Sequence, residues 1–167
     1  MTRAYIGLGS NMRDREANLA KAAGLISQST RVLMISSLYL TEPEVYKDQP
    51  DFLNSVACID TDLNAGELLK ILNGIEMKMG RERPFAGAPR LIDLDLLLYD
   101  GAIINEPGLE VPHPRMHLRS FVMVPMVEIA PELIHPALHK NMKELLAGLP
   151  QGYRIEKWVS NTDKGSG

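Results

Sequence analysis

Blocks of apolar and polar positions along the chain predict an alternation of short strands and amphipathic helices. Residues 4–10 form an apolar run that ends on small residues, which predicts a buried strand. Behind an acidic start, apolar residues recur at helical spacing over residues 14–28 and predict a helix. Residues 31–40 are rich in Val, Ile, Leu and Tyr and predict a second strand, and residues 56–61 predict a third.

The second helix carries the clearest signals. Asn64 is followed three residues later by Glu67, a pair typical of a capping box. A single apolar stripe then follows, made of Leu68, Leu69, Leu72, Ile75 and Met79. Gly80 ends the predicted helix.

The rest of the chain adds a strand over residues 91–99, helical segments near 121–129 and 142–146, and a short strand over 153–158. The resulting order is β-α-β-β-α-β, followed by extra helices and a short strand. This order predicts an α+β fold, a ferredoxin-like sandwich with C-terminal helical additions.

Composition narrows the class of protein. The 167 residues, with 45% hydrophobic and 23% charged content, are ordinary for one globular domain, which we expect to cover residues 1–159 with a flexible tail over 160–167. The net charge of -3 is not typical of a protein that binds nucleic acid or an anionic membrane. A lone Cys58, strand-like sequence directly after Met1 and no apolar run of ~20 residues predict a cytoplasmic protein without signal peptide or membrane span. We expect a monomer, although the sequence does not give the oligomeric state.

Two connections are long for so small a domain. They cover residues 41–53 and 80–90, whereas most connections have about 4–6 residues. Both contain prolines and charges. Loops of this length are often functional lids, so we expect the chemistry between them; plain surface decoration is the alternative.

Asp93 and Asp95 are the most informative pair of residues. On a strand they share one side, about 6–7 Å apart, while Leu94, Leu96 and Leu98 fill the other side. Two like charges repel unless a cation lies between them, and oxygen ligands without cysteine suit Mg²⁺. The alternative is an acidic strand face that meets solvent or nearby arginines.

Arginines gather in sequence around this acidic pair, at Arg81, Arg83, Arg90, Arg115 and Arg119. A guanidinium group binds phosphate oxygens through two hydrogen bonds. Arginines beside a two-carboxylate metal site are typical of phosphoryl transfer, although each arginine alone is typical of a solvated surface.

His113 lies between Pro112 and Pro114 in a stiff, extended turn. It is a candidate to donate to a phosphate or to transfer a proton, the alternative being a histidine satisfied by backbone groups. His117 lies four residues later, but Pro114 argues against the helix that a zinc-binding pair would need.

Two further pairs of residues, two phenylalanines and two glycines, have a structural interpretation as well as a functional one. Phe52 and Phe121 are candidates to stack on a flat heterocycle, with core packing as the alternative. Gly7 and Gly9 match neither a dinucleotide fingerprint nor a P-loop, so we assign them to a strand-to-helix turn.

With these residues in order, nearly the whole chain resembles the 6-hydroxymethyl-7,8-dihydropterin pyrophosphokinase family. The most specific stretch is residues 80–83 followed by 88–95. Further matching stretches lie at residues 5–11, 48–54, 111–115, 119–121 and 157–158.

The resemblance implies a ferredoxin-like enzyme of folate biosynthesis. Its partners would be ATP and 6-hydroxymethyl-7,8-dihydropterin, and its products the pterin diphosphate and AMP. Asp93 and Asp95 would hold two Mg²⁺ ions and, with Arg81 and Arg90, would be the catalytic residues.

The resemblance also implies binding roles. Contacts to ATP would come from Arg81, Arg90, His113 and Arg119, with Arg83 in the lid and with Glu76 and Leu96 near the nucleoside. Contacts to the pterin would come from Asn54 at its edge, from Phe52 and Phe121 on its faces, and from backbone groups around Thr41, Pro43 and Glu44.

The chain departs from the family pattern in a few places. Members often carry a tryptophan in the lid, and residues 85–90 contain none. Phe52 replaces a tyrosine, and Gly108 and Glu110 replace a basic and a hydroxyl residue of some members. Two other functions stay open: a nucleic-acid or regulatory binding module on the same fold, and a relative that binds ATP without turnover.

Overall fold

The computed structural model describes residues 1–80 and 89–160. Its elements are β1 (Thr2–Ser10), α1 (Arg15–Ser27), β2 (Arg31–Ile35), β3 (Tyr39–Thr41), β4 (Phe52–Thr61), α2 (Ala65–Lys78), β5 (Asp93–Tyr99), β6 (Ile104–Glu106), β7 (Leu109–Val111), the 3₁₀ turn η1 (Met116–Leu118), α3 (Ser120–Ile129), α4 (Met142–Ala147) and β8 (Ile155–Lys157). The predicted α+β class is confirmed, and the sheet is antiparallel.

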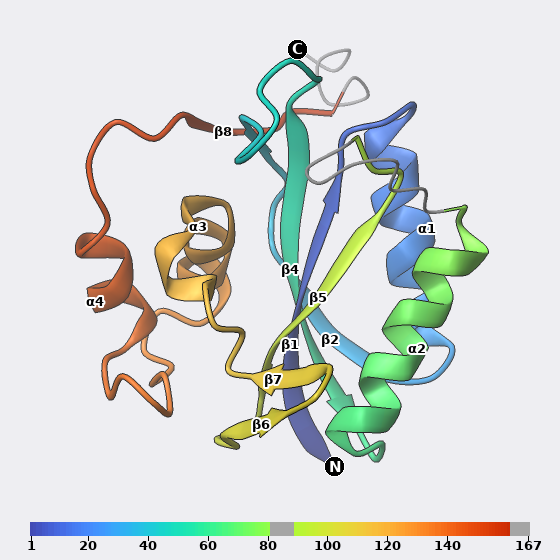
Figure 1. Cartoon of the computed structure of the whole chain (residues 1–167), viewed down its shortest axis with the longest axis vertical. Helices are drawn as coiled ribbons and strands as arrows, with labels where there is room; N and C mark the ends of the chain where they lie inside the picture. Colours follow the sequence, from blue (N-terminus) through green and yellow to red (C-terminus); the bar gives the residue numbers. More distant parts are fainter. Residues whose placement is uncertain (81–88, 161–167) are drawn as a thin grey trace.

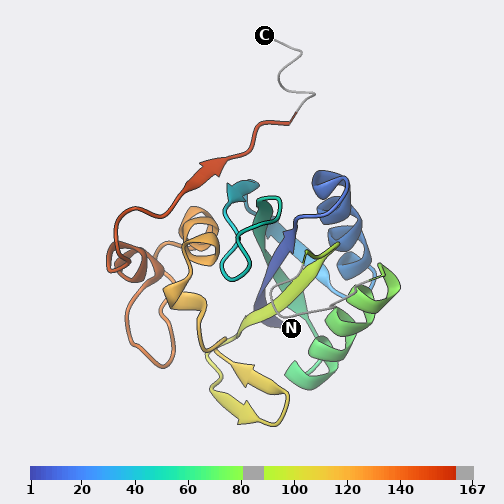
Figure 2. The same cartoon turned by 45° about the horizontal axis from the view of Figure 1, so that its top comes forward.

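Among the described residues, six strands form the main sheet, in the order β5-β1-β4-β3-β8, with β2 also paired to β4. Helices α1 and α2 cover one face, and α3 and α4 lie on the other (Figure 1). Apolar residues of β1, β4 and β5 point to both faces and form one core beneath α1 and α2 and a second against α3 and α4. The central strands of the sheet are therefore buried on both sides, and Figure 2 shows the same helices on the two sides of the sheet in an oblique view.

The predicted start of α2 is confirmed in detail. The Asn64 side chain accepts a hydrogen bond from the Glu67 N–H at 2.8 Å, and the Glu67 carboxylate accepts one from the Asn64 N–H at 3.0 Å. These bonds satisfy two of the N–H groups that a helix leaves unpaired at its start.

The strand predicted over residues 31–40 is wrong in one respect, because it breaks into β2 and β3. The break lies at Ser36, whose N–H donates to the Val56 carbonyl and whose hydroxyl accepts from the Val56 N–H, both at 2.9 Å. A side chain thus replaces a backbone partner at this point. The β6–β7 hairpin is an element that the sequence pattern did not predict.

The prediction that Leu98 shares a face with Leu94 and Leu96 is wrong. Leu96 pairs with Ile6, but Leu98 pairs with Tyr5, so Leu97 is an extra residue in the ladder. A bulge of this kind reverses the alternation of side chains beyond it. Leu98 accordingly packs in the core beneath α3.

The assignment of Gly7 and Gly9 to a turn is also wrong, because β1 continues to Ser10. A Cβ atom on Gly9 would lie 2.7 Å from Oδ1 of Asn54, so this position needs glycine for the close approach of β4.

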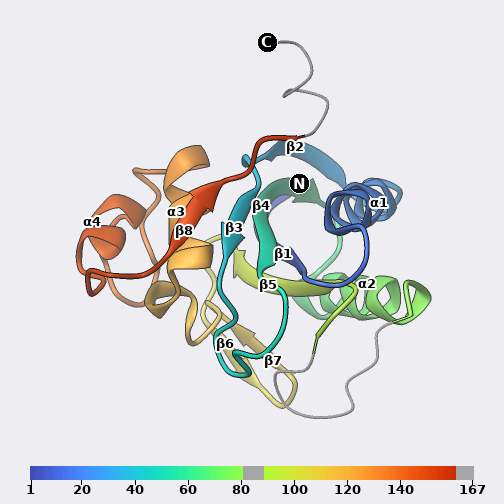
Figure 3. The same ribbon diagram turned by 90° about the horizontal axis from the view of Figure 1, so that it is seen from above.

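The C-terminal strand β8 lies beside β3 and extends the sheet at its edge (Figure 3). The Trp158 N–H donates to the Leu38 carbonyl at 2.8 Å, and Arg154 forms an ion pair with Asp51 at 2.7 Å. These contacts attach the end of the described chain to β3 and to the connection that follows it. Within residues 1–80 and 89–160, the helices are too short or too polar to cross a membrane.

Candidate active site

Two adjoining cavities open at one end of the sheet, with volumes of about 280 and 390 Å³. The first lies between β1, the β3–β4 connection and the start of α3, and the second lies between α2, β5 and the β6–β7 hairpin. Asp93, Asp95 and His113 line both cavities. A ligand bound in either one would therefore meet the acidic pair.

The two carboxylates have open space beside them because their neighbours on β1 are glycines. Asp93 pairs with Gly9 and Asp95 pairs with Gly7 in the antiparallel register. A residue with a side chain at either glycine would stand directly beside a carboxylate on the same face. The two glycines thus leave the face of the sheet next to the acidic pair free of neighbouring side chains from β1.

The pair suits a divalent cation. Burial and the charge of Asp93 raise the pKa of Asp95, while Arg119 and Arg90 act in the opposite direction. A cation between the two carboxylates would remove this repulsion. No group of three or more His, Cys, Asp or Glu side chains among the described residues could by itself hold a metal ion, so the remaining ligands would be substrate oxygens and water, as is usual for Mg²⁺.

Two arginines carry buried donors directed at the site. Nη1 of Arg90 lies 2.9 Å from Oδ2 of Asp93, and the Arg119 guanidinium lies 5.4 Å from the centre of the Phe121 ring. The Nε atoms of both arginines are buried and make no hydrogen bond with the described residues. Because buried donors are normally paired, these two N–H groups favour an anionic ligand.

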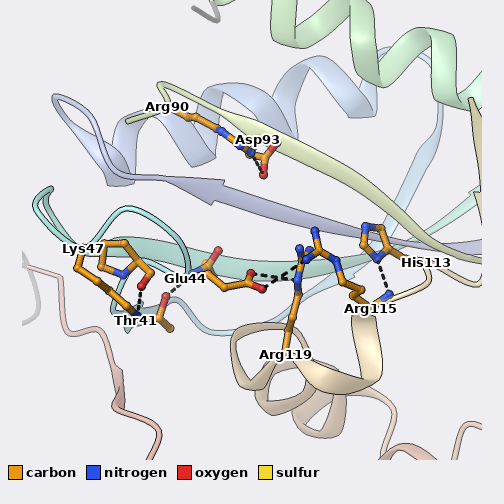
Figure 4. A network of polar contacts seen from close by, with 10 residues as sticks. Thr41, Glu44, Lys47, Arg90, Asp93, His113, Arg115 and Arg119 are labelled. Atoms are coloured by element: carbon orange, nitrogen blue, oxygen red, sulfur yellow. Dashed lines mark hydrogen bonds and ion pairs between the residues drawn. The ribbon is translucent and has the colours of Figure 1, made fainter. Parts of the chain in front are cut away.

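His113 is held by backbone contacts on two sides. Its N–H donates to the Leu97 carbonyl at 2.8 Å, and its Nδ1 accepts from the Arg115 N–H at 3.2 Å (Figure 4). Burial first, and then Arg119 and Arg115, lower its pKa to about 4. The imidazole is therefore neutral at pH 7, and with Nδ1 as acceptor its proton lies on Nε2 as a donor.

The residues expected near the nucleoside lie together in the second cavity. Glu76 and Leu96 both line it, with Leu69 and Asn73 from α2. The buried Glu76 carboxylate accepts a hydrogen bond from the Leu94 N–H at 3.0 Å, which fixes α2 against β5 between the two aspartates.

Most residues expected to contact the pterin line the first cavity: Thr41, Glu44, Phe52, Asn54 and Phe121. The Asn54 amide donates to the Thr41 hydroxyl at 2.6 Å, so β3 orients this side chain. Pro43 lines a smaller neighbouring cavity of about 170 Å³, which Thr41, Glu44 and Phe121 also line. Arg81, Arg83 and the lid positions over 81–88 lie outside the described residues.

Asn11 is a site residue that sequence reasoning missed. Its N–H donates to the Arg90 carbonyl at 3.0 Å, and its Oδ1 accepts from the Arg90 N–H at 2.7 Å. Its amide nitrogen donates to Gln49 at 2.7 Å and to the Pro50 carbonyl at 3.1 Å. One buried residue thus joins the two long connections. A polar residue directly after a buried strand was the available signal.

Solved structures support the fold. The chain covers 44% of the wild-type Plasmodium falciparum HPPK-DHPS structure with pteroate, with a TM-score of 0.71 over 87% of this chain and 14% sequence identity. At this identity the likeness concerns the fold alone.

Sequence relatives add the family. The chain is 40% identical to the 2-amino-4-hydroxy-6-hydroxymethyldihydropteridine pyrophosphokinase of Bacillus subtilis, over 96% of this chain and 94% of that protein. It is 44% identical to the Haemophilus influenzae protein of the same name, over 81% and 86% of the two chains. Against the folic acid synthesis protein of Dictyostelium discoideum it is 37% identical over 90% of this chain, but spans only 23% of that protein. Residues 5–131 match the model of the 7,8-dihydro-6-hydroxymethylpterin-pyrophosphokinase (HPPK) family, and the chain belongs to this family.

Proposed function

We propose that this chain transfers the pyrophosphoryl group of ATP to 6-hydroxymethyl-7,8-dihydropterin, which yields the pterin diphosphate and AMP. The observation that carries the proposal is the acidic pair at the junction of two cavities, beside two arginines whose buried Nε–H groups make no hydrogen bond with the described residues. Membership of the HPPK family supports the same reaction.

The second cavity is proposed to take the nucleoside and the first to take the pterin. Phe52 and Phe121 line the first cavity from two different elements, β4 and α3. Their side chains would stack on the two faces of the pterin ring. Asn54, oriented by Thr41, would hydrogen-bond the edge of the ring. In this arrangement the hydroxymethyl arm would point toward Asp93 and Asp95.

Positioning and charge neutralisation are the main tasks of the protein in such a transfer. Asp93 and Asp95 would hold two Mg²⁺ ions, which supply charge neutralisation at the phosphate oxygens. Arg90 and Arg119 would direct their buried Nε–H groups at the triphosphate, and His113 would donate from Nε2. Arg81 and Arg83 would add contacts from the lid. The pterin oxygen forms a bond to the β-phosphorus as the bond from that phosphorus to the oxygen bridging the α-phosphate breaks.

We infer further that the fold is ferredoxin-like. The strand order β5-β1-β4, with β2 and β3 together on the far side of β4, supports this assignment if β2 and β3 count as one interrupted strand. The β1-α1-β2 and β4-α2-β5 units then carry the two helices of one face.

The deciding experiment follows nucleotide products from Mg-ATP with and without 6-hydroxymethyl-7,8-dihydropterin. Pterin-dependent AMP release without ADP is expected. ADP formation instead would mean transfer of the γ-phosphoryl group, and binding of ATP without turnover would identify a silent relative. Either result contradicts the proposal.

A further inference from the structure

Glu44 places a carboxylate against the arginines of the site. Its Oε2 lies 3.1 Å from Nε of Arg119, and its Oε1 lies 4.0 Å from Nη1 of Arg115 (Figure 4). Glu44 belongs to the β3–β4 connection, whereas the two arginines flank η1. The ion pairs therefore span the first cavity, from its loop wall to its α3 wall.

The contact between Glu44 and Arg119 is close but poorly aligned. Nε of Arg119 makes no hydrogen bond with the described residues even though the Glu44 oxygen is 3.1 Å away. The Arg119 side chain is 14% exposed and that of Glu44 is 42% exposed. A half-exposed carboxylate thus covers a buried donor from the solvent side. An ion pair of this geometry contributes little stability, so a better-aligned acceptor can replace the Glu44 carboxylate.

Other acidic residues of the same connection do not make this contact. Glu42 and Asp48 are exposed and form no ion pair with the described part of the chain. Asp51 pairs with Arg154, on the side of β8. Glu44 is therefore singled out by position and not by charge alone.

We propose that the Glu44 carboxylate competes with the phosphates of the nucleotide for Arg119. The inference rests on the proposed function, in which Arg119 contacts the triphosphate. A phosphate oxygen and the Glu44 oxygen cannot both occupy the space next to the same N–H, and each repels the other. Glu44 acts through Arg119, so it is a positioning residue that weakens anion binding until it is displaced.

The test measures binding of inorganic pyrophosphate with Mg²⁺ by calorimetry. Glu44→Gln keeps the size of the side chain and removes its charge, and is expected to bind pyrophosphate about threefold more tightly, which corresponds to ~0.6 kcal/mol. Glu44→Ala is expected to show a gain in the same direction. Asp48→Asn removes the same charge from the same connection and is expected to bind as the wild type does.

A double-mutant cycle locates the effect. In an Arg119→Gln background, Glu44→Gln is expected to leave pyrophosphate affinity unchanged. Equal gains for Glu44→Gln and Asp48→Asn would overturn the inference and indicate a general electrostatic effect of the charge. The inference would also be overturned if Glu44→Gln gave no gain in affinity, or if the gain persisted in the Arg119→Gln background. Because turnover is not measured, these outcomes are separate from failure of the proposed function, which shows only as missing AMP.

Discussion

Asp95 is a partly buried carboxylate that has another carboxylate, Asp93, as a neighbour on its own strand. Burial and this neighbour raise its pKa, and Arg119 and Arg90 only partly compensate. A group in such surroundings destabilises the folded protein, because desolvation and repulsion both oppose its charge. Stability therefore does not explain its presence in the middle of β5, and we propose that it is there to bind a ligand.

Asp95→Asn is expected to lower kcat/KM for AMP formation by at least ~10³-fold, about 4 kcal/mol of transition-state stabilisation, because one of the two carboxylates proposed to bind metal is lost. The free energy of unfolding is expected to stay equal or rise, because repulsion with Asp93 disappears. Product assays and urea unfolding measure the two effects.

The control for this substitution is Asp60→Asn, at the far end of β4, where Asp60 lies 3.6 Å from Arg3. Turnover of the control is expected to match that of the wild type. A fully active Asp95→Asn protein would show that Asp95 has no part in the reaction.

At the scale of elements, the site depends on how closely β1 and β4 approach each other. Gly9 pairs with Asn54 across these strands and leaves room for its amide. Thr41 on β3 holds the other end of that amide. Three strands therefore fix one side chain at the edge of the first cavity.

Gly9→Ala is expected to weaken pterin binding about tenfold, because the new Cβ would lie 2.7 Å from Oδ1 of Asn54 and would force that side chain away from Thr41. Overpacking of this kind also lowers the free energy of unfolding by ~1–3 kcal/mol. Titration with the pterin, followed by calorimetry, measures the affinity. Unchanged affinity would mean that Asn54 does not touch the ligand.

Gly24→Ala makes the same chemical change in a helix. Nothing lies within 4 Å of a Cβ at Gly24, an exposed position inside α1. Alanine is expected to raise the free energy of unfolding by ~0.5–1 kcal/mol, because it loses less backbone entropy than glycine. Urea unfolding measures this gain, and pterin affinity should not change. A loss of stability would indicate a contact of α1 beyond those seen.

At the scale of the whole molecule, Glu128 connects α3 to the sheet through hydrogen bonds. Near the end of α3, its carboxylate accepts hydrogen bonds from the Ser37 N–H at 2.8 Å, from the Ser37 hydroxyl at 3.1 Å and from the Tyr39 hydroxyl. Burial pushes the pKa of Glu128 upward, but the hydrogen bonds from Tyr39 and Ser37 outweigh it and lower the pKa. The same helix begins with the residues that wall the first cavity.

Glu128→Gln is expected to lower the free energy of unfolding at pH 7 by about 1 kcal/mol, since charge-assisted hydrogen bonds are lost. The folded-state pKa lies below the ordinary 4.5. The contribution of Glu128 is therefore complete above pH 4.5 and declines as the pH falls through the folded-state pKa. Urea unfolding of both proteins at pH 7 and pH 3.5 should show the difference shrinking. A difference that is independent of pH would contradict this account.

Several features of the fold and the site could be predicted because they depend on neighbours in the sequence. The capping box of α2 joins residues three apart, and the shared face of Asp93 and Asp95 follows from the period of a strand. Backbone geometry determines both, whatever surrounds them.

The missed features depend on residues far along the chain. Ser36 breaks a strand by bonding to Val56, and Asn11 joins Arg90 to Gln49 across gaps of 79 and 38 residues. No local pattern encodes such a partner. Only the register between strands shows that Gly9 faces Asn54.

The sequence by itself thus determined the helices, most strands and the acidic pair, because periodicity and capping act within a few residues. The tertiary structure alone decided that Leu98 turns to the other core, that glycines lie beside the carboxylates, and that Glu44 meets Arg119. These outcomes follow from strand register and loop path, which are set by packing between distant segments and have no period in the sequence.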